Sequence, residues 1–144
     1  MQNQPPLQTS NRQVAPSPKS STGLDENIAA LLSYVMTWVT GLIFFLIEKE
    51  SRLVRFHAMQ ALILGGVAAV SSFVLWIAYF VVIIIASQIH GALGSLLSIL
   101  LGLVIFLFFA AIIVGWILGM VKAYQGQYFK LPVIGNFAEK FSAK

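Results

Sequence analysis

The stretch ALILGGVAAVSSFVLWIAYFVVIIIASQIHGALGSLLSILLGLVIFLFFAAIIVGWILGMV, residues 61–121, contains no Asp, Glu, Lys or Arg. Its 61 residues would form about 90 Å of α-helix, whereas the hydrocarbon core of a bilayer is about 30 Å thick. A backbone inside lipid satisfies its hydrogen bonds only in helices or closed barrels, and barrel strands alternate polar with apolar side chains. This stretch has no such alternation, so it predicts membrane-embedded helices.

The composition of the whole chain agrees with that prediction. Hydrophobic residues make up 58% of the 144 positions and charged residues 10%, whereas soluble domains are about one quarter charged. The chain has no cysteine, which excludes disulfides and thiolate metal sites. Its net charge of +4 is better explained by lysines and arginines that flank membrane spans than by nucleic-acid binding.

Three regions are expected along the chain. Residues 1–23 are rich in Pro, Gln and Ser and lack an apolar signal segment, so they are predicted to be a disordered tail. Residues 24–125 are expected to form a transmembrane helical domain. Residues 126–144 are expected to form a cytoplasmic tail that includes a short amphipathic segment.

The predicted fold class is all-α, a polytopic bundle of transmembrane helices. Three long spans are expected, at about 28–47, 53–87 and 95–122. The alternative has four spans, because the second stretch is longer than one crossing needs and could divide near Ser71 and Ser72. No proline or polar loop occurs there, which favours three spans.

Basic residues predict the orientation of such a protein. With three spans, the turn after the first span and the C-terminal tail share one side, and together they hold seven of the nine basic residues. Cytoplasmic loops carry the excess of Lys and Arg. We therefore expect a multi-pass protein of a prokaryotic cytoplasmic membrane with its N-terminus outside and its C-terminus inside. The cations expected to set this topology and to bind lipid headgroups are Lys49, Arg52, Arg55 and Lys122.

Small residues predict where the spans touch, because helices in lipid associate through close packing. Such residues recur in each expected span. The positions expected at helix contacts are Ser33, Thr37, Gly41, Gly65, Gly115 and Gly119.

No catalytic residue, metal ligand or cofactor site is expected. The spans hold no paired carboxylates, and their serines have no histidine or carboxylate nearby in the sequence. His57 and Gln60 are the polar groups to be explained, since they lie on one face at the start of the second span. Either water or the C-terminal segment satisfies them, or they form a polar site for a partner or a lipid headgroup. The residues expected to complete that site are Tyr124, Gln125 and Asn136.

The segments LDENIAALLSYVMTWVTGLIFFLIEKESRLVRFHAMQAL (24–62) and AYQGQYFKLPVIGNFAEK (123–140) resemble a widespread family of small prokaryotic membrane proteins of unknown function. That family is similar to the twenty-kilodalton subunit of the chloroplast inner-envelope (Tic) protein-import translocon. The resemblance implies an accessory or assembly subunit, related to protein translocation. The alternative is a small oligomeric channel or transporter. The expected partners are the lipid bilayer and either another membrane protein or further copies of the chain, and nucleic acid is not expected.

Overall fold

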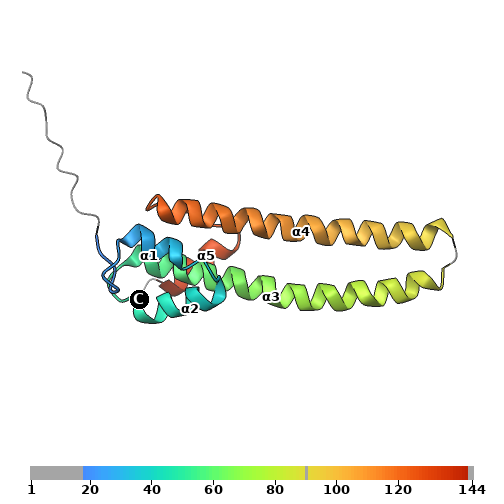
Figure 1. Ribbon diagram of the computed structural model, residues 1–144, viewed down its shortest axis with the longest axis horizontal. Helices are drawn as coiled ribbons and strands as arrows, with labels where there is room; N and C mark the ends of the chain where they lie inside the picture. The colour runs from blue at the N-terminus through green and yellow to red at the C-terminus, as the bar shows by residue number, and fades with distance from the viewer. Residues whose placement is uncertain (1–17, 90, 143–144) are drawn as a thin grey trace, which may run out of the picture.

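The computed structural model describes residues 18–89 and 91–142, and these residues form five helices. The helices are α1 (Glu26–Leu32), α2 (Trp38–Ile47), α3 (Arg52–Ser87), α4 (Ala92–Tyr124) and α5 (Ile134–Ser142). Figure 1 shows α3 and α4 as a long antiparallel hairpin, with α1, α2 and α5 gathered around one end. We call that end, residues 18–65 and 115–142, the head. The remainder of α3 and α4 is the stalk.

The number of long apolar helices corrects the predicted number of spans. Only α3 and α4, of 36 and 33 residues, are long and apolar enough to cross a membrane within the described part of the chain. The predicted span 28–47 is instead divided into α1, of 7 residues, and α2, of 10 residues. At about 15 Å, α2 reaches roughly half way through a hydrocarbon core. The four-span alternative is also wrong, because α3 continues unbroken through Ser71 and Ser72.

Hydroxyl side chains explain why the first apolar stretch breaks. Thr37 has a φ of 45°, an uncommon conformation for a β-branched residue. The Thr40 hydroxyl donates to the Ser33 carbonyl at 2.9 Å and accepts from the Met36 amide at 3.1 Å. On α4, the Trp116 indole N–H donates to the Tyr34 carbonyl at 2.8 Å. These bonds satisfy backbone groups that the broken helix leaves free, which an apolar environment requires.

The two ends of this broken segment are held together by a buried carboxylate. Glu48, at the end of α2, accepts hydrogen bonds from the Ser21 amide at 3.0 Å and the Ser21 hydroxyl at 2.8 Å. It also accepts from the Glu50 and Ser51 amides, at 3.0 Å and 2.9 Å. We call these four residues the Glu48 clasp. Within the tail predicted to be disordered, Ser21 thus makes defined contacts, and residues 1–17 lie outside the described part.

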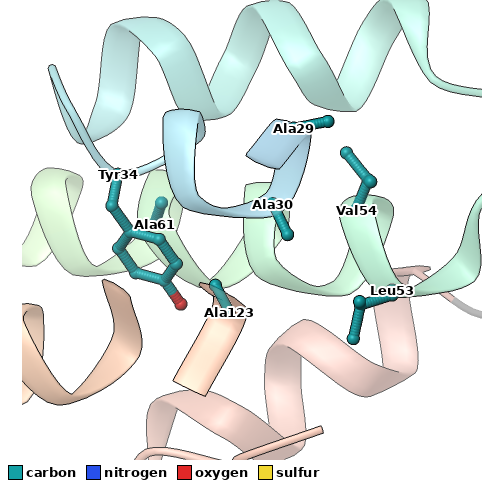
Figure 2. Packing of buried hydrophobic residues seen from close by; sticks show 7 residues of the cluster. All are labelled: Ala29, Ala30, Tyr34, Leu53, Val54, Ala61 and Ala123. Carbon is teal, nitrogen blue, oxygen red and sulfur yellow. The ribbon is translucent and has the colours of Figure 1, made fainter. Parts of the chain in front are cut away.

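Among the residues that the structure describes, the hydrophobic core cluster lies in the head. Figure 2 shows small side chains between α1, the start of α3 and the end of α4, with the Tyr34 ring among them. No residue of α3 between Gly65 and Ala86 is buried, and none of α4 between Gly94 and Gly119. The unburied stretch 66–85 has 20 residues, about 30 Å of helix, and it continues the uncharged run that begins at Ala61.

The residues predicted at helix contacts all lie in the head. A Cβ on Gly41 would lie 2.8 Å from the Ala58 carbonyl oxygen, and one on Gly119 would lie 2.8 Å from the Tyr34 ring. Gly41 and Gly65 therefore mark the crossing of α2 and α3, and Gly119 receives Tyr34. The other predicted positions are Ser33, which is buried, Thr37, whose Cβ faces Gly65, and Gly115, which faces Leu131.

The Glu48 clasp predicts a dependence of stability on pH. Burial alone would raise the pKa of Glu48, but hydrogen bonds from Ser51, Ser21 and Glu50 outweigh burial and lower it. A lowered pKa stabilises the folded state above the unfolded-state pKa of about 4.3, and this contribution is lost as pH falls through the folded-state value. We expect Glu48→Gln to lower the free energy of unfolding at pH 7 by about 1.5–3 kcal/mol, since it removes a charged acceptor.

Thermal melting in detergent at pH 7 and at about pH 3.5 tests this expectation. The wild-type midpoint should fall on acidification more than that of Glu48→Gln. The matched control is Glu139→Gln, which removes an exposed carboxylate paired with Lys130 at 2.7 Å and should change little. Equal midpoints for wild type and Glu48→Gln at pH 7 would show that the clasp does not stabilise the fold.

Candidate functional site

Three buried polar side chains meet in the head. Tyr34, from the break between α1 and α2, and His57 and Gln60, from α3, are each 0% exposed. The Tyr34 hydroxyl lies 3.2 Å from His57 Nδ1, and Gln60 Nε2 donates to the same hydroxyl at 2.9 Å. Because His57 and Gln60 are three residues apart on a helix, both side chains point toward the same neighbour. We call this group the polar cluster.

The polar cluster binds the segment 127–131, which joins α4 to α5. His57 Nε2 lies 3.0 Å from the Gln127 carbonyl oxygen. Gln60 Nε2 donates to the Phe129 carbonyl at 3.2 Å, and Gln60 Oε1 accepts from the Leu131 amide at 3.2 Å. One side-chain amide thus pairs with a donor and an acceptor of the extended backbone. The segment is held by its main chain, from side chains about 70 positions earlier in the sequence.

The hydrogen bonds of the cluster fix its protons. The Gln127 carbonyl can only accept, so His57 Nε2 carries a proton and donates. A neutral imidazole then has an acceptor at Nδ1, which receives the Tyr34 hydroxyl proton. The Tyr34 oxygen accepts from Gln60 in turn. A protonated His57 would leave the Tyr34 hydroxyl proton without its acceptor at Nδ1, so the arrangement fits a neutral histidine.

Aromatic rings close the site around His57. Phe56 meets the imidazole edge to face, with ring centroids 5.2 Å apart, and Tyr128 lies against Phe56 at 5.6 Å. Phe56 is buried, and Tyr128 is exposed on the outer side. The cluster therefore lies inside packed side chains, and its hydrogen-bonding atoms bind one another and the segment 127–131.

The structure places the remaining predicted site residues outside the cluster. Tyr124 is exposed, and Asn136 lies exposed on α5. Gln125 accepts from Lys122 at 3.2 Å. In the described residues, no hydrogen bond joins these three predicted partners to His57 or Gln60. Tyr34 was missed, because a tyrosine inside an apolar stretch is an ordinary core residue from its sequence alone.

The predicted headgroup cations occupy two kinds of position. Lys49 and Arg52 are exposed, and Lys122 donates to Gln125 and Gln127. Arg55 differs, because its guanidinium donates to the Glu48 carbonyl at 2.8 Å and lies 4.9 Å from the centre of the Phe45 ring. Arg55 therefore makes a directional contact at the base of α2 as well as carrying charge.

The described part of the chain contains no candidate metal centre. Its histidines and acidic residues form no group of three or more that could hold an ion.

Comparison with known proteins places the chain among membrane proteins. Residues 24–138 match the magnetosome magnetite crystal formation protein family, MamF/MmsF. A UPF0132 membrane protein of Methanocaldococcus jannaschii is 42% identical over 125 residues, which cover 86% of this chain and 94% of that protein. A second from the same organism is 39% identical over 119 residues, covering 83% and 71%.

A UPF0132 membrane protein of Archaeoglobus fulgidus is 38% identical over 117 residues, covering 81% of this chain and 95% of that protein. No solved structure matches. These relatives confirm the expectation of a small prokaryotic membrane protein. None of these matches names the chloroplast translocon subunit. The similarity to that subunit therefore stays a prediction from sequence.

Proposed function

We propose that this chain, which belongs to the MamF/MmsF family, acts within a prokaryotic membrane as a non-enzymatic assembly subunit. The family is described by magnetite crystal formation in magnetosomes, and its archaeal relatives are named only as membrane proteins. For this chain we propose only the general role of binding a membrane partner through its stalk.

The observation that supports the proposal is that the stalk has no buried residues along most of its length. Neither helix has a buried residue over the length of a hydrocarbon core, since α1, α2 and α5 all pack on the head. Two helices can cover only one side of each other. Between them runs a groove of about 440 Å³, lined mainly by aromatic and apolar side chains and by Gly102 and Ser72. Grooves with small residues admit a further helix, because close packing drives association in lipid.

The polar cluster supports a structural role for the head. Each of its donors and acceptors is engaged within the chain, with Tyr34, His57 and Gln60 bonded to one another and to the backbone of segment 127–131. A buried network that is fully satisfied fixes one packing arrangement. It holds the C-terminal segment and α5 against α3 and leaves the stalk free for a partner.

A second candidate is a channel formed by several copies. The groove contains two residues that carry hydroxyls, Ser72 and Tyr79, at the depth of the membrane. Two crossing helices enclose no pore, so conduction would require the stalks of several copies to line one together.

Purification in mild detergent, followed by native mass spectrometry, tests these candidates. A stoichiometric foreign membrane protein supports the assembly role. A homo-oligomer that conducts ions in liposomes supports the channel, and a monomer recovered alone from native membranes contradicts both.

A groove variant makes that experiment specific. A Cβ on Gly102 would lie 3.8 Å from the Tyr79 ring, an ordinary contact, so Gly102→Leu fills the groove without disturbing the head. We expect it to lose at least tenfold in partner recovery, about 1.4 kcal/mol, with an unchanged melting midpoint. The control is Val104→Leu, at a position 62% exposed on the same helix. Equal recovery from the two variants would mean that the groove is not the contact.

A further inference from the structure

We propose that α1 and α2 form a re-entrant hairpin, which enters and leaves the membrane on one face and packs α2 against the acyl chains of that leaflet. The chain would then cross the membrane twice, with both ends of the hairpin and residues 122–142 on the same side. This inference concerns membrane topology and stands whether or not the stalk binds a partner.

The first argument is that the hairpin closes on itself. Ser21 precedes α1 and Glu48 ends α2, and the Glu48 side chain accepts from both the amide and the hydroxyl of Ser21. The Lys49 amide also donates to the Ser21 hydroxyl, at 2.9 Å. A segment that crossed the bilayer would hold its ends about 30 Å apart. Here the ends are in hydrogen-bond contact, so the segment returns to its starting side.

The second argument is the depth that the hairpin reaches. Its tip is the break at Thr37 and Trp38, which lies against Gly65, the last buried residue before the bare stretch 66–85. Between Asn27 and Glu48 there is no charged side chain. The tip therefore lies beside the uncharged part of α3, and the polar clasp lies at the opposite end of the hairpin.

The third argument identifies what covers the outer face of α2. Its exposed side chains are apolar and large, namely Leu42 at 40%, Ile43 at 50%, Leu46 at 65% and Ile47 at 46%. Trp38, 52% exposed at the tip, continues this face toward the stalk. At the base the face ends in Lys49, a position suited to anionic headgroups. An apolar face that is continuous with the stalk and bounded by a cation fits a lipid leaflet.

Charge sets the orientation. All seven basic residues within the described ranges lie at residues 19–55 or 122–140, in the head, and residues 61–121 carry no charge. The turn between α3 and α4 therefore has no Lys or Arg. Because the excess of positive charge stays inside, the head faces the cytoplasm. The sequence prediction of an N-terminus outside followed from three spans, which the two long helices replace.

Cysteine labelling tests the topology, since the chain has no cysteine of its own. Single cysteines replace Thr22 before α1, Glu50 after α2, Gln88 in the far turn and Lys140 on α5, all exposed positions. In intact cells or spheroplasts, an impermeant maleimide should label Gln88→Cys alone, and the other three should react only after permeabilisation. Labelling of Thr22→Cys from outside, with Glu50→Cys protected, would overturn the proposal because α1 and α2 would then cross.

Spin labels test the lipid contact. In liposomes with anionic lipid, a label at Leu46→Cys should be relaxed by oxygen as strongly as one at Val70→Cys in the stalk, and a label at Glu50→Cys should be relaxed by a water-soluble nickel complex. Nickel relaxation at Leu46→Cys would place α2 in water and refute the proposal. Dipolar broadening there between labelled copies, with low oxygen access, would show a second copy on this face and would also refute it.

Discussion

Replacing Gln60 with leucine is expected to lower the free energy of unfolding by about 2–6 kcal/mol and to release the segment 127–131. The substitution keeps the approximate volume of the side chain but removes both of its polar atoms. The Leu131 amide loses its acceptor, and the Phe129 carbonyl loses its donor. A buried group left without a partner costs about 1–3 kcal/mol, and the lost bond to the Tyr34 hydroxyl adds to this.

Melting in detergent and hydrogen exchange together measure this effect. In Gln60→Leu the Leu131 amide should exchange faster, and trypsin should cleave more readily after Lys130, which precedes it. His57→Leu should have a smaller effect, because it frees only the Gln127 carbonyl and the Tyr34 hydroxyl. Gln88→Leu, at an exposed position in the turn between α3 and α4, is the matched control. A protected Leu131 amide and a wild-type midpoint in Gln60→Leu would contradict the role given to Gln60.

The stalk could be predicted from sequence because lipid solvation depends on composition. An uncharged run of 61 residues has to form helices, and Gly91 lies in the turn between them. The hairpin of α1 and α2 could not be predicted in the same way. Its stretch is as apolar as a span, and the break depends on the Thr40 hydroxyl bonding backbone groups at Ser33 and Met36. From the sequence alone, residues with small hydroxyl side chains in this stretch are equally consistent with helix-packing positions.

The candidate site was predicted in part for a related reason. His57 and Gln60 attract notice because they are polar groups beside a long apolar run. Their partners in segment 127–131 are backbone atoms, and a carbonyl or amide leaves no trace in the sequence of side chains. The expected partners, Tyr124, Gln125 and Asn136, lie on either side of the true contact at segment 127–131.

Two adjacent glycines should respond to the same substitution with opposite signs. A Cβ on Gly65 would lie 2.7 Å from the Trp38 backbone nitrogen and 2.9 Å from the Trp38 Cβ, whereas one on Gly66 would meet nothing within 4 Å. Backbone at the tip of the α1–α2 hairpin cannot move aside as a flexible side chain would. We expect Gly65→Leu to cost about 3 kcal/mol, at the upper end of the range for overpacking, and to push the hairpin away from α3.

Gly66→Leu should instead be neutral or stabilising by up to about 1 kcal/mol, because glycine in a helix interior is less favourable than residues with side chains. Both variants add the same apolar side chain at consecutive positions of α3, so their insertion into the membrane should be equal, and only the contact with Trp38 distinguishes them. The measurement is the melting midpoint, together with tryptophan fluorescence after Trp76→Phe, with Trp116 kept because it bonds the Tyr34 carbonyl. Equal midpoints and equal spectra in the two variants would mean that the tip of the hairpin does not rest on Gly65, and the depth inferred for α2 would fail with it.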